Sequence, residues 1–210
     1  MDVSPLEELP LAQRLALSYA PGGVRDDLLT LLLLDNRLSA ILRQKGEVMI
    51  TQIKLAWWRD RLGEDPSIWP QGEPLLERLK HLPFAPAGLV PLVDGWERLL
   101  DEELGEDALR DFAQGRAVPW LKVATGEGVC ATAQSWALTD LALNLNPGEE
   151  RAAVAEAARL IPVKPGLPRA VRPLAVLHTL GRRAIHRDTD DLLDGPGAML
   201  VALRIGMIGR

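Results

Sequence analysis

Proline and glycine divide this 210-residue chain into segments that are otherwise rich in helix-forming residues. The chain holds 16 Pro and 18 Gly, and only 4% of its residues are aromatic. Leu, Ala, Arg and Glu, which dominate the intervening segments, favour α-helices, whereas β-branched and aromatic residues favour strands. No segment shows the alternation of apolar and polar residues that is typical of a half-buried strand. The sequence therefore predicts an all-α protein.

The breaks between segments set the bounds of about ten predicted helices. These cover residues 9–20, 24–44, 47–62, a short segment ending at 80, 89–103, 106–125, 128–146, 149–160, 169–187 and 199–208. Pro119 falls inside the sixth helix and should kink it. Nothing repeats at a fixed period, and no linker is long enough to separate two domains. We therefore expect one helical bundle over residues 1–210.

Charge and cysteine content exclude several classes of function. The formal net charge is −5, so no basic surface points to nucleic acid. The single cysteine, Cys130, cannot form an internal disulfide or a cysteine-based metal site, which is typical of a reducing compartment. The three histidines, His81, His178 and His186, are too scattered for a zinc site.

The N-terminal residues and the apolar runs favour a cytoplasmic protein. The chain begins MDVSPLEELPL, which has no basic segment before an apolar run and does not resemble a signal peptide. The longest apolar stretch, residues 28–34, is far shorter than the roughly 20 residues that span a bilayer.

Residues 47–62 read EVMITQIKLAWWRDRL. This segment resembles the pattern E-x-M-x-x-Q-[RK]-L-x-W-W-R-x-x-L of the squalene/phytoene synthase family, allowing small offsets. Taken alone, the pair Trp57-Trp58 is better explained by core packing, so the resemblance rests on the ordered set of segments. Other segments resemble family motifs in the same order: Tyr19-Ala-Pro21 followed by Arg25, Asp94-Gly-Trp-Glu97, Phe112-Ala-Gln-Gly115 and Leu138-Thr-Asp-Leu-Ala-Leu-Asn144. The resemblance covers nearly the whole chain and implies the isoprenoid synthase fold, an all-α bundle around a central cavity.

The resemblance also implies a chemistry that this sequence lacks. Family enzymes join two prenyl diphosphates with magnesium held by two aspartate-rich motifs. Alignment of the segments places the three aspartates of the first motif, D-D-x-x-D, on Ser39, Ala40 and Arg43. At the second motif, Asp140 and Asn144 stand where the family has Asn and Asp. A single carboxylate cannot hold three magnesium ions.

We therefore predict a family member without catalytic residues, metal or cofactor. Its vestigial cavity positions are Asp35, Ser39, Ala40, Arg43, Asp140 and Asn144.

Three other sets of polar residues are alternative candidates for a functional site. Residues 190–194 read D-D-L-L-D, but they lie next to Gly195-Pro196-Gly197, which predicts a solvent-facing turn. Asp26 and Asp27 fall in the first turn of a helix, where the helix dipole favours negative charge. His178 and His186 lie among arginines; they form either an anion-binding face or, as the helix dipole favours, a solvated helix end.

Three functions remain open at this level. The first is a non-catalytic assembly factor, because the family includes a mitochondrial assembly factor of respiratory complex I that resembles this sequence around the Trp-Trp helix. The second is a binding protein that keeps the cavity for an apolar ligand. The third is an active prenyltransferase of squalene/phytoene biosynthesis, with magnesium and with motifs that this alignment misplaces.

The partners are also left open. We expect a protein partner or an apolar ligand, and no nucleic acid. The apolar last helix, 199–208, packs on its own bundle, on a second copy or peripherally on a membrane, and the oligomeric state stays undetermined.

Two structural predictions follow from the helical spacing. Eight side chains should face inward: Leu31, Leu34, Leu38, Leu42, Ile53, Trp57, Leu121 and Leu138. Arg43 should pair with Asp140 or Asp35 and so close the former metal site. The alternative is that Arg43 reaches solvent at the helix C-terminus.

Overall fold

The computed structural model describes residues 4–44, 47–100 and 104–209, and these residues form helices and no strands. The α-helices are α1 (Leu11–Leu17), α2 (Gly22–Arg43), α3 (Val48–Gly63), α4 (Pro74–Leu79), α5 (Val90–Glu97), α6 (Glu106–Val123), α7 (Glu127–Asn144), α8 (Glu149–Leu160), α9 (Arg172–His186) and α10 (Gly195–Ile208). Short 3₁₀ turns cover Pro66–Ile68, Pro86–Leu89, Arg98–Leu100 and Arg169–Val171. The predicted all-α class is confirmed.

Most predicted helix bounds lie within a few residues of the observed ones. The fifth helix differs, because α5 ends at Glu97 and passes into a 3₁₀ turn; residues 101–103 of the prediction lie outside the described residues. Lys45-Gly46, the expected break before α3, also lies outside them. The last helix begins at Gly195 rather than 199, because Pro196 occupies its first turn, where the missing N–H costs nothing. Pro119 lies within α6, which continues to Val123.

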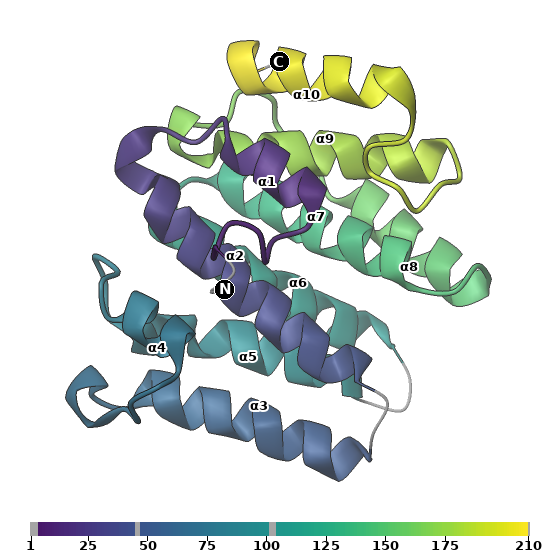
Figure 1. Ribbon diagram of the computed structural model, residues 1–210. Coiled ribbons are helices and arrows are strands. Elements are labelled where there is room, and N and C mark those ends of the chain that lie inside the picture. Colours follow the sequence, from purple (N-terminus) through teal and green to yellow (C-terminus); the bar gives the residue numbers. More distant parts are fainter. Residues whose placement is uncertain (1–3, 45–46, 101–103, 210) are drawn as a thin grey trace.

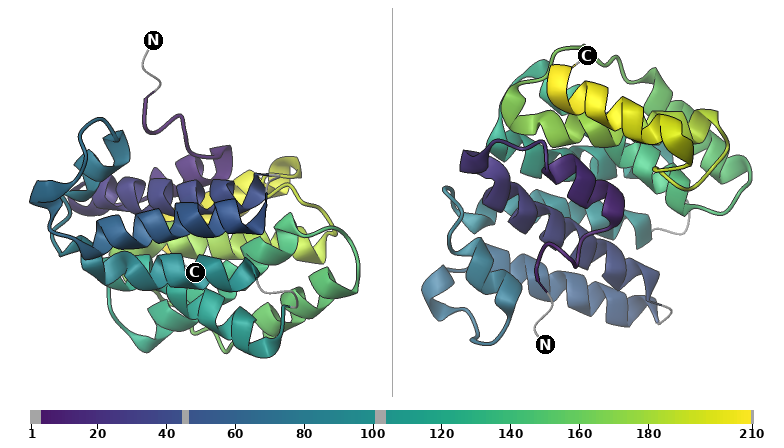
Figure 2. Two further views of the ribbon diagram at one scale, coloured as in Figure 1. Left: turned by 90° about the horizontal axis from the view of Figure 1, so that it is seen from below. Right: turned by 45° about the horizontal axis from the view of Figure 1, so that its top comes forward.

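Neighbouring helices in the chain are mostly neighbours in space (Figure 1). Helix α6 packs between α5 and α7, helix α7 contacts α8 and α9, and α9 carries α10 on its far side. Helix α2 crosses this stack and contacts α3, α4, α5 and α6 (Figures 1 and 2). Its buried side, which includes Leu28, Leu31, Leu34 and Leu38, follows the helical spacing of three and four residues.

A close crossing joins α5 to α6 through two glycines. A Cβ atom added to Gly115 would lie 2.3 Å from the carbonyl oxygen of Pro91 and 2.9 Å from Cα of Gly95. Only glycine allows two backbones to approach this closely. The crossing brings Trp96 and Phe112 into edge-to-face contact, with ring centroids 5.1 Å apart.

The predicted inward-facing residues are mostly confirmed. Leu31, Leu34, Leu38 and Leu138 are buried, and Leu42 and Leu121 are partly buried against the core. The prediction is wrong for Ile53 and Trp57, which are 58% and 38% exposed. On α3 the buried side chains are instead Thr51, Leu55, Trp58 and Leu62.

The error on α3 has a physical cause. This helix carries apolar residues on nearly every side, so its hydrophobic pattern does not select one face. Contact with α5 and α2 decides which side is covered.

In the described part of the chain, no helix combines the length and apolar character that a membrane crossing requires.

Candidate functional site

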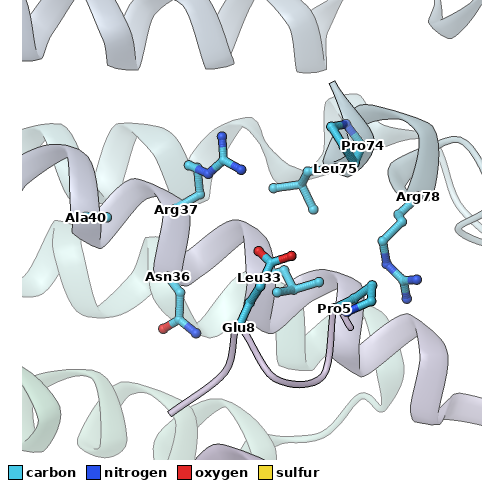
Figure 3. Close-up of a pocket in the computed structure, with 9 residues that line it drawn as sticks. All are labelled: Pro5, Glu8, Leu33, Asn36, Arg37, Ala40, Pro74, Leu75 and Arg78. Carbon is cyan, nitrogen blue, oxygen red and sulfur yellow. The ribbon is translucent and has the colours of Figure 1, made fainter. Parts of the chain in front are cut away.

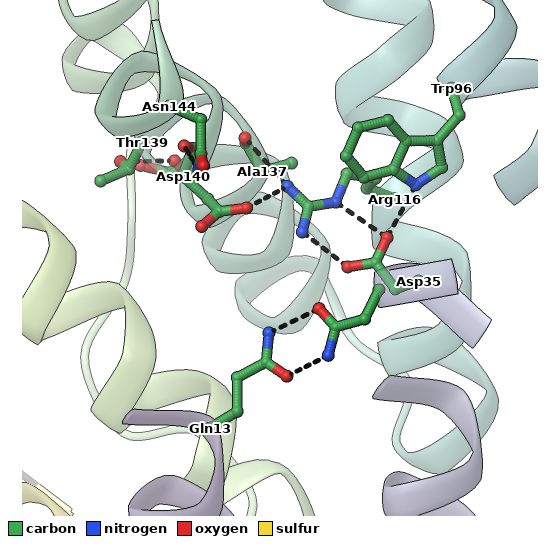
Figure 4. A network of polar contacts seen from close by, with 10 residues as sticks. Gln13, Asp35, Trp96, Arg116, Ala137, Thr139, Asp140 and Asn144 are labelled. Atoms are coloured by element: carbon green, nitrogen blue, oxygen red, sulfur yellow. Dashed lines mark hydrogen bonds and ion pairs between the residues drawn. The ribbon is translucent and has the colours of Figure 1, made fainter. Parts of the chain in front are cut away.

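Three charged side chains from α2, α6 and α7 meet inside the bundle (Figure 4). The Arg116 guanidinium donates two hydrogen bonds to the Asp35 carboxylate, Nη2 to Oδ2 at 2.6 Å and Nε to Oδ1 at 3.1 Å. Its Nη1 donates to Oδ2 of Asp140 at 2.9 Å and to the carbonyl oxygen of Ala137 at 3.3 Å. We call Asp35, Arg116 and Asp140 the buried triad.

Aromatic side chains complete the surroundings of the buried triad. Trp96 donates from Nε1 to Oδ1 of Asp35 at 2.8 Å (Figure 4). The Arg116 guanidinium carbon lies 4.9 Å from the centroid of the Trp96 ring and 5.5 Å from that of Phe112. These distances are within the range of cation–π attraction. Arg116 therefore has partners along its edge and on its faces.

The local sequence explains how α6 presents these groups. Phe112, Arg116 and Trp120 are spaced four residues apart and therefore lie on one side of the helix. Gly115 lets that side approach α5, which supplies Trp96. Asp35 is the first charged residue after the apolar run of α2 and sits where that helix crosses α6.

Burial and charge shift the pKa values of two members of the triad, Arg116 and Asp140. The side chains of Arg116, Asp35 and Asp140 are only 5%, 14% and 24% exposed. Burial alone would lower the pKa of Arg116, but the two nearby carboxylates outweigh it and raise this pKa above its usual value. Burial raises the pKa of Asp140, the Arg116 charge opposes this, and the Asp35 charge adds to it. In the triad, one guanidinium therefore forms ion pairs with two carboxyl groups.

The space beside the triad is almost completely filled. A cavity of about 10 Å³ remains there, lined by Leu28, Leu31, Leu32, Asp35, Arg116, Pro119 and Trp120. This volume is at the lower limit for a single water molecule. A metal ion at Asp35 and Asp140 would also have to displace the guanidinium, because both carboxylates already accept hydrogen bonds from it.

The structure brings two of the six predicted cavity positions together and separates the others. Asp35 and Asp140 share Arg116, whereas Ser39 and Ala40 are partly buried elsewhere on α2. Asn144 is exposed, and its amide donates to the backbone carbonyl of Asp140 at 2.8 Å.

The predicted pairing of Arg43 is wrong. Arg43 lies exposed in the last turn of α2, roughly 12 Å along the helix axis from Asp35. Among the described residues, no carboxylate lies within ion-pair distance of its guanidinium. The charge of Arg43 opposes the rise in the pKa of Asp140, but it is the smallest of the influences on that pKa.

Arg116 is the functional residue that the sequence analysis missed. One signal could have found it, because it is a charged residue directly before the apolar run of α6 from Ala117 to Leu121.

The other acidic groups behave as ordinary surface charges. The segment 190–194 forms the predicted turn before α10, but only Asp190 and Asp191 are exposed, and residues 192–194 are half-buried. Asp190 pairs with Arg151 at 2.5 Å. Asp26, in the first turns of α2, pairs with Arg78 at 2.6 Å. Within residues 4–44, 47–100 and 104–209, no three side chains of His, Cys, Asp or Glu lie together as a metal-binding group.

A second polar cluster joins α7 to α9. Ser135 donates from Oγ to the carbonyl oxygen of Ala158 at 2.9 Å and lies 3.1 Å from Nε2 of His178, which is therefore the donor in that contact. The predicted solvated helix end is wrong for His178, which is buried. Burial, with a smaller contribution from the charge of Arg182, lowers the pKa of His178 to about 4. Ser135 is also buried.

The surface carries a separate pocket of about 250 Å³ between the N-terminal segment, α2 and α4 (Figure 3). Glu8, Arg37 and Arg78 point toward it, and Ala40 forms part of its wall. The two arginines already have carboxylate partners, Glu73 at 3.4 Å from Arg37 and Asp26 for Arg78. Their charges are therefore largely neutralised within the protein.

Comparison of the chain with protein-family models, with curated proteins and with solved structures found no match.

Proposed function

We propose that this chain is a non-catalytic relative of the squalene/phytoene synthases that serves as an assembly or ligand-binding factor. The observation that carries the proposal is the buried triad. A magnesium-diphosphate site needs carboxylates that are free to bind metal ions. Here Asp35 and Asp140 face each other from α2 and α7, and Arg116 occupies the space between them.

The filled interior favours assembly over transport of a lipid in the centre of the bundle. Pockets that enclose small ligands usually measure about 300–1,000 Å³. The cavity beside the triad, at about 10 Å³, is far below that range. A partner protein needs only an exposed contact surface, and α3 offers an apolar one formed by Val48, Met49, Ile50, Ile53 and Trp57.

An active prenyltransferase is the alternative. The facing of Asp35 and Asp140 across the bundle favours it, because opposed carboxylates are what such an enzyme requires. Activity would require the Arg116 side chain to leave both carboxylates and open a cavity. Breaking a buried ionic contact of this kind leaves uncompensated charge and costs on the order of 3–5 kcal/mol.

A turnover assay tests the proposal against this alternative. Purified protein is incubated with Mg²⁺ and farnesyl or geranylgeranyl diphosphate, and pyrophosphate release is measured against a heat-inactivated sample. We expect no release above that control. Release that EDTA abolishes would contradict the proposal.

Native mass spectrometry then separates the two branches of the proposal. We expect the bare mass of the chain. A lipid that co-purifies in stoichiometric amount would favour the ligand-binding branch over assembly. We also propose a cytoplasmic location, supported by the single free cysteine, Cys130.

A further inference from the structure

The surface pocket between the N-terminal segment, α2 and α4 is lined by side chains from all three elements (Figure 3). From α2, Leu33, Arg37 and Ala40 line it at helical spacings of four and three residues, so they share one side of that helix. From α4, Leu75 and Arg78 line it in the same way. Its volume of about 250 Å³ lies just below the range of about 300–1,000 Å³ that is typical of drug-sized ligands, so it suits a smaller molecule.

Glu8 brings an unpaired carboxylate to this pocket. Its neighbour Leu9 is buried in the core, and the N–H of Leu9 donates to the carbonyl oxygen of Leu6 at 3.3 Å, which closes a turn around Glu8. The Glu8 carboxylate points toward the pocket (Figure 3). Among the described residues, its side chain has no hydrogen bond and no ion pair. The pocket therefore contains a carboxylate that is free to bind a cation.

Arg37 has hydrogen-bond donors to spare. Its ion pair is the 3.4 Å contact from Nη1 to Oε2 of Glu73, which is longer than the roughly 2.7–2.9 Å of a strong charge-assisted bond. Its Nε and Nη2 donate to no group among the described residues. Arg78 differs, because its Nη2 donates to Oδ1 of Asp26 at 2.6 Å. Arg37 is therefore the arginine of this pocket that can bind the carboxylate of a ligand.

The charges around the pocket do not favour a free anion. The charged residues that line it or pair with its arginines are Glu8, Asp26, Arg37, Glu73 and Arg78. Three of these are acids and two are arginines, and Arg43, one turn beyond Ala40 on α2, makes the two signs equal. Glu7 and Asp27, which adjoin two of these acids in the chain, add negative charge. A ligand that binds here must therefore bring a positive charge, even if its carboxylate contacts Arg37.

We propose that this pocket binds a free α-amino acid with an apolar side chain. The ammonium group of the ligand donates to the Glu8 carboxylate, and its carboxylate accepts from the donors of Arg37 that Glu73 leaves free. Leu33 and Leu75 contact its side chain. Both charges of the ligand then have partners in the protein. This inference goes beyond the proposed function and does not depend on it, because none of these residues belongs to the buried triad.

Isothermal titration calorimetry on the full chain tests the proposal with matched probes. L-Leucine carries both charges, 4-methylpentanoate lacks the ammonium group and 3-methylbutylamine lacks the carboxylate. We expect one leucine to bind per chain and the other two probes to bind at least about tenfold more weakly, because each leaves a charged group of the protein without a partner. Glycine should also bind at least about tenfold more weakly, because it lacks the apolar side chain. Absence of saturable leucine binding, or a second probe that binds as tightly as leucine, would overturn the proposal.

Two variants with matched controls locate the site. Glu8→Gln should weaken leucine binding at least about tenfold, whereas Glu150→Gln removes the same charge from an exposed position on α8 and should leave it unchanged. Arg37→Gln should weaken it to a similar degree, whereas Arg110→Gln, which breaks a surface pair with Asp107, should not. Circular dichroism verifies that all four variants are folded.

The same variants give a readout that a general loss of structure would not produce. Glu8→Gln should remove the preference for leucine over 4-methylpentanoate, because the ammonium group no longer has a partner. Arg37→Gln should remove the preference for leucine over 3-methylbutylamine, because the ligand carboxylate no longer has one. Unchanged leucine affinity in either variant, or equal weakening by its control, would contradict the assignment of this pocket.

Discussion

Substitution of Arg116 by methionine is the most direct test of the buried triad. The change keeps a long, helix-favouring side chain in α6 but removes the only cation that contacts Asp35 and Asp140 among the described residues. Four hydrogen bonds are lost, two to Asp35, one to Asp140 and one to the carbonyl of Ala137. Two carboxylates would remain in a largely dry interior.

The expected loss of unfolding free energy follows from the two carboxylates that stay buried without Arg116. Removing one partner from a buried ionic cluster costs on the order of 3–5 kcal/mol. Asp140 is 24% exposed and can regain some hydration, and Trp96 still donates to Asp35. We therefore expect a loss near the lower end, about 3 kcal/mol of unfolding free energy. For a domain of this size, each kcal/mol lowers Tm by roughly 2–4 °C.

The assay is urea denaturation followed by circular dichroism, with a matched control on the same helix. Arg110→Met breaks an exposed pair with Asp107, in which the two side chains are 56% and 78% exposed. Exposed pairs contribute at most about 1 kcal/mol, so this variant should resemble the wild type. The cost of Arg116→Met should also shrink at pH 5, where buried carboxylates without a cation take up protons.

A third variant, Arg116→Met/Asp35→Asn/Asp140→Asn, removes the charges together. It should recover much of the lost stability, because no uncompensated charge stays buried. Equal and small losses for Arg116→Met and Arg110→Met would refute the energetic role that we assign to the triad.

Two further predictions concern the α7–α9 and α5–α6 contacts. Because the pKa of His178 is about 4 when folded but 6.5 normally, the unfolded chain binds a proton that the folded protein excludes between these values. The protein should therefore lose about 3 kcal/mol of stability as the pH falls from 6.5 to 4, and His178→Gln should lose clearly less in a pH series of urea titrations. Gly115→Ala should destabilise by about 1–3 kcal/mol, since its Cβ would meet backbone atoms of Pro91 and Gly95. Gly23→Ala, with open space around the added Cβ, should be neutral or slightly stabilising, and Gly115→Ala behaving like it in thermal melts would contradict the proposed close crossing.

The helices themselves were largely predictable because their signals are local. A helix closes its hydrogen bonds within four residues, and the residues that start and stop it lie at its ends. Pro147-Gly148 thus separates α7 from α8 as expected. Even the error at α10 is a local one, since Pro196 is tolerated in a first turn and the helix begins there rather than after it.

The covered side of α3 and the partner of the two acids required the tertiary structure. Trp58 rather than Trp57 is buried because α3 packs on α5 and α2, and the apolar pattern of α3 is satisfied by either side. Asp35 and Asp140 were predicted to belong to one site. The residue that joins them, Arg116, lies 81 positions from Asp35 and 24 positions from Asp140 in the chain. That contact depends on how α2, α6 and α7 are placed relative to one another, and the close backbone approach at Gly115 brings α5, with Trp96, to the same place. The sequence by itself determined the helices. Only the packing of the helices decided which cation is buried with the remaining acids, because charge pairing in an interior follows distance in space and not position in the chain.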